Sequence, residues 1–177
     1  LTATQGSIII GYIKAQNGDV YLNAGNSIIK KEDSLLNKII ANNIYLKTET
    51  EDIAIDYVEA SNGAIELISG GNITVVTIDS AQVSVTAVGN INLTTVKAAN
   101  GNIDIVSTEG SINADSVVAD KGTIDIKGKE NTKVTSATAE IGKIILTSTF
   151  GDVSFGQIRA NEVKINASKS INAFGSI

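Results

Sequence analysis

A length of 177 residues suffices for one domain with a substantial core, and a net charge of −5 leaves no basic footprint for nucleic acid. The chain contains no Cys and no His, which excludes disulfides, thiol chemistry and the commonest acid–base and metal-binding side chain. No apolar run is long enough to predict a transmembrane helix. With only 4 Tyr, 3 Phe and no Trp, the core must consist of Ile, Val, Leu and Ala.

A short motif recurs along the chain: a small residue, two variable positions, Gly, one further position, and two apolar residues separated by one position. Segments 15–22 and 119–126 both show it and align without gaps. Extending the alignment predicts a first strand in every unit, at Val20/Leu22, Ile44/Leu46, Ile65/Leu67, Val83/Val85, Ile103/Ile105, Ile124/Ile126, Ile144/Leu146 and Val163/Ile165. Successive pairs begin 24, 21, 18, 20, 21, 20 and 19 residues apart, so the unit is about 20 residues long.

Two further strands complete each unit. The second follows a turn that often combines Gly with Asn, Ser or Asp, and its pair positions are Ile8/Ile10, Ile28/Lys30, Ile53/Ile55, Ile73/Val75, Ile91/Leu93, Ile112/Ala114, Thr132/Val134, Val153/Phe155 and Ile171/Ala173. The third has the pair positions Ile13/Ala15, Ile39/Ala41, Val58/Ala60, Ile78/Ser80, Val96/Ala98, Val117/Ala119, Ala137/Ala139 and Ile158/Ala160. The second member of this third pair is nearly always small, which suits a tight corner.

Three short strands cannot enclose a core alone, but stacked units can, because each strand then pairs with its equivalent in the next unit. The repeat therefore predicts an all-β parallel β-helix with three-strand coils, eight to nine coils and a triangular cross-section. Right-handed coiling is expected, since parallel crossovers are almost always right-handed. The absence of a 3.6-residue period argues against helices, and an antiparallel sandwich would not explain the same three strands in every unit.

The middle residue of each strand triplet should face solvent, and most of these residues are polar. The N-terminal third differs, because outward positions there are apolar, at Ile9, Ile29, Ile40, Tyr21 and Tyr45. Scattered apolar residues are common on protein surfaces, so these residues need no partner. Alternatively, they form a candidate interaction surface covered by another domain, a loop or a second rod.

One unit departs from the spacing. Between Ile28 and Ile39 lie about six extra residues, which predicts an inserted loop at 30–38. Insertions in solenoids often carry specific contacts, and we add Leu35 and Leu36 of this loop to the candidate interaction surface. The simpler interpretation, which we favour, is a tolerated surface loop or one helical turn whose leucines cover the nearby apolar residues.

The residues that β-helical polysaccharide enzymes need are not evident. Such enzymes use clustered carboxylates, bases or Ca²⁺ ligands, usually with aromatic platforms for sugars. Asp104 and Asp125 would stack one coil apart, but no Arg, His or aromatic residue accompanies them, so a solvated column is the favoured interpretation. We therefore predict no catalytic residue, no metal site and no cofactor.

The amino-acid sequence of the central units resembles the repeats of a known family. Segments 71–75, 89–93, 100–105 and 110–114 read Gly-Asn-Ile-Thr-Val, Gly-Asn-Ile-Asn-Leu, Asn-Gly-Asn-Ile-Asp-Ile and Gly-Ser-Ile-Asn-Ala. They are similar to the internal repeats of filamentous haemagglutinin-like exoproteins, the β-helical adhesins exported by two-partner secretion. The secretion-guiding domain of that family is not evident. Bactofilins and other adhesin-type β-helical domains are rivals, although bactofilin coils are usually shorter.

That resemblance implies a secreted or cell-surface location, a shaft role, and adhesion to a host or bacterial cell-surface receptor. We predict that residues 1–177 are a single β-solenoid segment of a longer chain, structural and not enzymatic. Its partners would be further coils or domains of the same chain, or neighbouring subunits, with no nucleic acid and no membrane insertion. The alternative is a self-assembling filament subunit that stacks end to end, and a polysaccharide-active enzyme is the third hypothesis.

Overall fold

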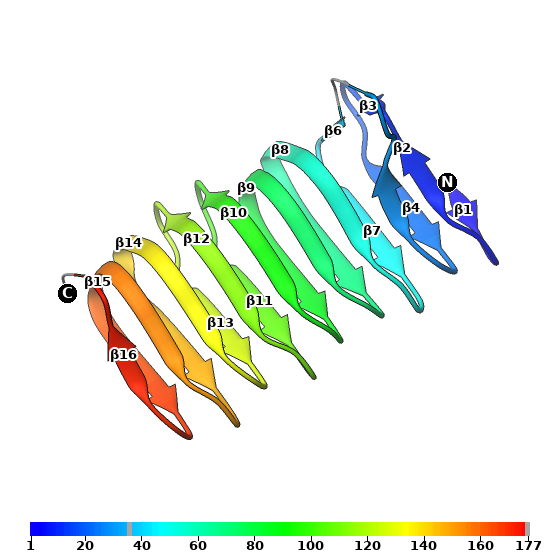
Figure 1. Cartoon of the computed structure of the whole chain (residues 1–177). Helices are drawn as coiled ribbons and strands as arrows, with labels where there is room; N and C mark the ends of the chain where they lie inside the picture. Colours follow the sequence, from blue (N-terminus) through cyan, green and yellow to red (C-terminus); the bar gives the residue numbers. More distant parts are fainter. Residues whose placement is uncertain (35–36, 176–177) are drawn as a thin grey trace.

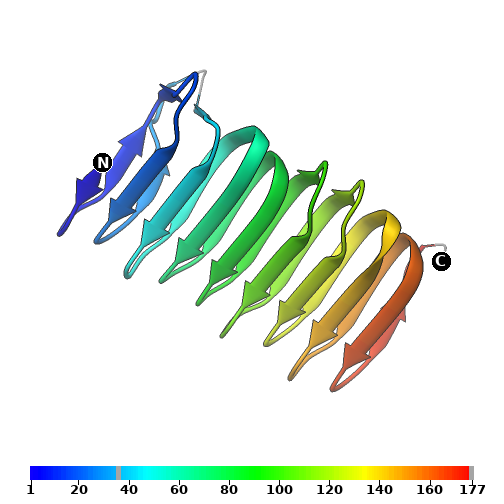
Figure 2. The same cartoon turned by 180° about the vertical axis from the view of Figure 1, so that it is seen from behind.

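The three-strand repeat winds into one continuous parallel β-solenoid of about 8 turns, with about 20 residues in each turn. The computed structural model describes residues 1–34 and 37–175, and within these ranges 16 strands form one sheet and no helix occurs. Figures 1 and 2 show opposite faces of the stack, with the two termini at opposite ends. The predicted fold class is confirmed.

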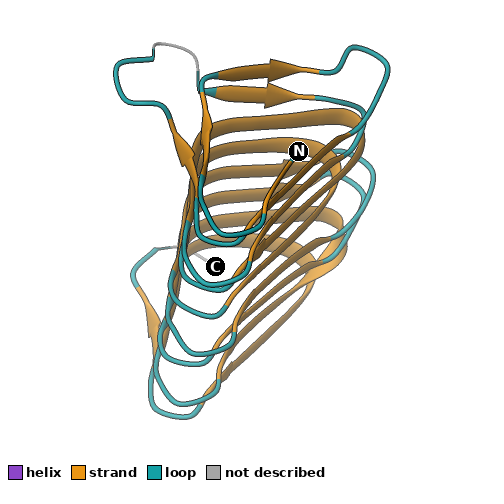
Figure 3. Cartoon of the chain, turned by 90° about the vertical axis from the view of Figure 1, so that its right-hand side faces the viewer, coloured by secondary structure: helices purple, strands orange, loops and turns teal. Residues whose placement is uncertain are grey.

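Three sides make up each coil, and Figure 3 shows them from the N-terminal end. Short strands on the first side are β1 (Thr2–Ala3), β4 (Val20–Ala24), β7 (Ile44–Thr48), β11 (Ile103–Ser107) and β13 (Ile124–Gly128). Short strands on the second side are β2 (Ile8–Ile10), β5 (Ile28–Lys30) and β16 (Ile171–Ala173), and those on the third are β3 (Tyr12–Lys14) and β6 (Lys38–Ile40).

Longer strands turn the corners between these sides. The second and third sides are joined in β10 (Ile91–Ala98) and β12 (Ile112–Ala119), and all three are joined in β8 (Ile53–Ser69), β9 (Ile73–Ala87), β14 (Thr132–Ser148) and β15 (Val153–Ala167). Strand pairing keeps the register that the repeat predicts: Ile91 lies between Ile73 and Ile112, and Ile124 lies between Ile103 and Ile144.

Inward-facing side chains form continuous apolar columns along the axis. Most of the predicted pair residues are buried in this core, and Ile91, Val96 and Ile103 are fully buried. Exceptions occur at the last coil, where Val163 is 37% exposed and Ile171 is 53% exposed, because no coil covers them in this structure. Lys30, at another predicted inward position, is exposed and forms an ion pair instead.

Thr132 is a polar residue in a column that otherwise holds Ile or Val. It is fully buried, and its hydroxyl donates a hydrogen bond to the carbonyl of Thr147 at 2.8 Å. The hydroxyl also occupies the space beside Gly128, since a Cβ on that glycine would lie 2.6 Å from it. Gly128 stands where Ser107 and Ser148 place hydroxyls in the neighbouring coils. The Thr132 hydroxyl thus fills space that a side chain at position 128 would need.

A ladder of side-chain hydrogen bonds runs along the corner before the second side. We call it the corner ladder, and it comprises Asp52, Asn72, Asn90, Ser111, Asn131, Asp152 and Ser170. At each step a side-chain oxygen accepts a hydrogen bond from the backbone N–H of the equivalent residue in the next coil. For example, the carboxamide oxygen of Asn72 lies 2.7 Å from the amide nitrogen of Asn90. The corner ladder satisfies N–H groups at turns where strand pairing is interrupted.

We expect Asn90→Ala to lower the free energy of unfolding by about 1 kcal/mol, because the amide of Ser111 loses its acceptor. Urea unfolding followed by circular dichroism measures this change. Asn92→Ala is the matched control, since Asn92 is exposed on the outward side of the same strand. Equal stability of Asn90→Ala and wild type would show that water replaces the ladder at no cost.

Candidate interaction surfaces

Tyr21 and Tyr45 form an aromatic pair on the first side. They are register partners in β4 and β7, and their ring centroids lie 6.2 Å apart at an interplanar angle of 40°. Tyr21 is 61% exposed, and its hydroxyl donates to the carboxylate of Asp19 at 3.3 Å. The carboxylate also accepts from the backbone and side-chain amides of Asn43. The structure thus places these two predicted residues side by side.

The other predicted surface residues lie on different sides of the coil. Ile9 and Ile29 are partners on the second side, where Ile9 is 63% exposed and Ile29 is half-buried. Ile40 belongs to the third side, between Lys14 and Glu59. The apolar residues that the sequence grouped into one candidate surface therefore lie on three different sides of the coil. Leu35 and Leu36 fall outside the described residues.

The predicted insertion leaves the coil between β5 and β6. Asp56 of β8 anchors it, because its carboxylate accepts from Lys30 at 2.9 Å and from the side chain of Asn37 at 3.1 Å. The hydrogen bond from Lys30 lowers the pKa of Asp56 below its usual value. Asp33 adopts a left-handed conformation with φ of 60°, which Asp tolerates better than most residues. The insertion is thus fastened to the coil at its two ends.

On the third side a lysine ammonium lies over one tyrosine ring, a contact that the repeat did not predict. Lys38 pairs in register with Tyr12 and Tyr57, and its ammonium lies 3.9 Å from the centroid of the Tyr57 ring. It also lies 3.0 Å from the carboxylate of Glu59, which lowers the pKa of that carboxyl. Tyr12, Lys38 and Tyr57 each come directly before the third pair of their unit, so an alignment of that position would have brought them together.

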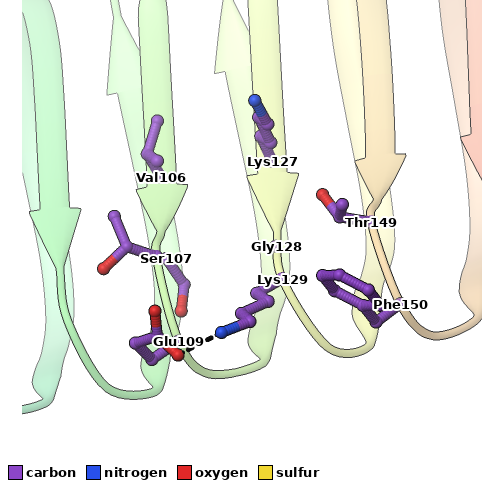
Figure 4. A pocket seen from close by; sticks show the side chains of 9 residues that line it. Val106, Ser107, Glu109, Lys127, Gly128, Lys129, Thr149 and Phe150 are labelled. Carbon is purple, nitrogen blue, oxygen red and sulfur yellow. Dashed lines mark hydrogen bonds and ion pairs between the residues drawn. The ribbon is translucent and has the colours of Figure 1, made fainter.

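A groove of about 320 Å³ crosses three coils at the turn between the first and second sides. Its lining residues include Val106 and Lys127 on the strands, and Glu109, Lys129, Thr149 and Phe150 at the turns. Figure 4 shows Glu109, Lys129 and Phe150 in a row across the three turns, with Lys129 paired to Glu109. The Lys129 ammonium lies 5.9 Å from the centroid of the Phe150 ring, and that side chain is 57% exposed. The sequence analysis did not predict this groove.

Asp104 and Asp125 stack one coil apart on the first side, as the repeat predicts. Burial, and secondarily the charge of Asp125, raise the pKa of Asp104 above its usual value. Neither carboxylate has an ion-pair partner among residues 1–34 and 37–175. In these ranges no group of three or more acidic side chains is placed to hold a metal ion.

We expect Asp104→Asn to raise the free energy of unfolding at pH 7 by about 0.5 kcal/mol, the effect of removing one like-charge contact between strands. Because the folded pKa is raised, ionisation of Asp104 destabilises the fold. Stability is therefore lost as the pH rises from the unfolded pKa through the folded pKa. The midpoint of urea unfolding of Asp104→Asn should exceed that of wild type at pH 7 and should equal it at pH 3. Asp115→Asn, at an exposed position, is the control.

The fold defines the class of protein, a parallel β-solenoid built from a repeat of about 20 residues. None of the described segments forms a helix long and apolar enough to cross a membrane. No protein-family model, curated protein or solved structure matches the chain.

Proposed function

We propose that this chain is a stiff, non-catalytic shaft segment of a secreted or surface-exposed bacterial adhesin. The observation that carries the proposal is the continuous strand register along the second side of the coil. On the second side, pairing runs without a shift through β8, β9, β10, β12, β14 and β15. A coil stack of this kind transmits force from one end to the other through its strand ladders.

Bending this stack would strain several bonds at once. Strand pairing on three sides and the corner ladder all link each coil to the next. The same units, at 71–75 and 89–93, carry the resemblance to filamentous haemagglutinin-like repeats. That resemblance supports the extracellular location and the adhesin type, which would bring a host or bacterial receptor as partner of the whole protein.

Apolar side chains are exposed on the last described strand, β16, and on the residue that follows it. Ile171 and Phe174 are each 53% exposed, and Ile171 continues the column of Val153. A further coil placed on this end would bury them. It would pair with β16 and with the part of β15 beyond Phe155, which has no second strand partner among the described residues. The coil could come from the same polypeptide, as in a shaft, or from a second molecule, as in a filament subunit that stacks end to end. The filament is our second candidate function.

Surface labelling tests the location. Antibodies against residues 1–177 should label intact cells that produce the protein as strongly as permeabilised cells. A cytoplasmic protein detected in the same cells serves as the control and should be labelled only after permeabilisation. Labelling of the solenoid confined to permeabilised cells would overturn the proposal.

Electron microscopy of the purified chain separates the two candidates. A shaft segment should give short rods of about 40 Å, the length of eight coils at about 4.8 Å each. Filaments many times longer at micromolar protein concentration would favour the end-to-end subunit instead. Particles of irregular outline would contradict both.

A further inference from the structure

We propose that the groove over Lys127 and Phe150 binds a saccharide that carries a carboxylate, such as a uronic acid unit. Three chemical features line the groove: an exposed aromatic ring, an ammonium without an ion pair among the described residues, and side chains that donate and accept hydrogen bonds. An acidic sugar offers the complement of each, namely an apolar ring face, a negative charge and several hydroxyls. The proposal does not depend on the shaft function, and either can fail alone.

Lys127 supplies the charge. Its Cα partners in the neighbouring coils are Val106 and Thr147, so neither adjacent position carries a carboxylate. Within residues 1–34 and 37–175, Lys127 forms no ion pair, whereas Lys129 is paired with Glu109. A ligand carboxylate at Lys127 therefore gains a partner without displacing an existing one.

Phe150 supplies the stacking surface. More than half of the side chain is exposed, and the ring stands at the edge of the groove beside the Lys129 ammonium. The exposed face of an aromatic ring provides apolar contact area at little cost in side-chain entropy. A pyranose ring, with its C–H bonds on one face, fits this platform and keeps its hydroxyls at the rim.

Glu109 and Thr149 supply hydrogen bonds. The Glu109 carboxylate accepts from sugar hydroxyls, and the Thr149 hydroxyl both donates and accepts. Glu109 also opposes ligands of high negative charge, because a phosphate chain placed along the turns would meet it (Figure 4). Three turns separated by about 4.8 Å span about 10 Å, so the groove accommodates about two sugar rings.

The test is titration of ¹⁵N-labelled protein with tetragalacturonate, followed by amide chemical shifts in NMR. We expect shifts concentrated at 106–109, 127–129 and 149–150. The methyl ester of the same oligosaccharide keeps the rings and removes the charge, and it should bind about tenfold more weakly, as expected for loss of one charge-assisted hydrogen bond. This comparison uses the wild-type protein and needs no variant to fold.

Variants assign the two contacts. Lys127→Gln and Phe150→Ser should each weaken tetragalacturonate binding about tenfold, whereas Lys164→Gln should leave it unchanged. Lys164 is the matched control, because it is an exposed lysine on the first side of the last complete coil. Absence of shifts in the groove, equal binding of the methyl ester, or unchanged binding by Lys127→Gln would each overturn the proposal. So would equal shifts with acetate alone, which would reveal a site for a bare charge.

Discussion

Replacing Gly122 by Ala should lower the free energy of unfolding of the solenoid by about 2 kcal/mol, the cost of forcing one extra carbon into a filled space. A Cβ at this position would overlap the carbonyl group of Gly101 and would lie 2.9 Å from the amide nitrogen of Asn102. Both obstacles are backbone atoms of the coil beside it, so relief requires the two coils to separate. Urea unfolding monitored by circular dichroism gives the change.

Gly18→Ala is the matched control, because Gly18 holds the same place in the repeated motif of an earlier coil. A Cβ there would meet no atom of the described residues within 4 Å, so we expect unchanged stability or a gain of about 0.5 kcal/mol from the stiffer unfolded chain. No glycine in the described chain has a positive φ. The two glycines therefore both have an ordinary backbone conformation, and they differ in the space available for a side chain. Equal losses of stability in Gly122→Ala and Gly18→Ala would contradict the explanation that close contact between coils excludes a side chain at Gly122.

The sequence predicted the coil because burial in a solenoid repeats at fixed positions. The alternation at Val20/Leu22 and Ile124/Ile126 indicated strands, and the spacing between units set the register that pairs Ile103 with Ile124. The corner ladder could not be predicted in the same way. A Gly-Asn pair indicates a turn. The hydrogen bond that the Asn90 side chain accepts from the amide of Ser111 depends on the distance and orientation between neighbouring coils.

Candidate surface residues were predicted only in part, for a physical reason. Tyr21 and Tyr45 share one column, so the repeat alone placed them together. Ile9 and Ile40 were grouped by chain position, yet they face different directions because the coil turns between them. The groove residue Phe150 occupies a turn, where unit lengths vary and the columns of the strands do not extend.

We expect Ile91→Ala to lower the free energy of unfolding by about 3 kcal/mol, the second large effect. Ile91 is fully buried in the inward column of the second side, between Ile73 and Ile112. Truncation to Ala removes apolar contacts with both neighbouring coils and leaves a cavity that the rigid strand ladders cannot close. Urea unfolding provides the measurement, with Asn92→Ala as a variant of the adjacent outward residue.

Ile171→Ala tests the same column where it is uncovered. Ile171 is 53% exposed, so its truncation removes contacts with one coil only and should cost less than about 1 kcal/mol. The difference between the two variants measures what contact with a second coil adds at one inward side chain. A cost at Ile171 equal to that at Ile91, and rising with protein concentration, would mean that a second molecule covers the last coil in solution. Such a result would favour the filament subunit over the shaft, because a second copy of the chain would then cover the exposed end.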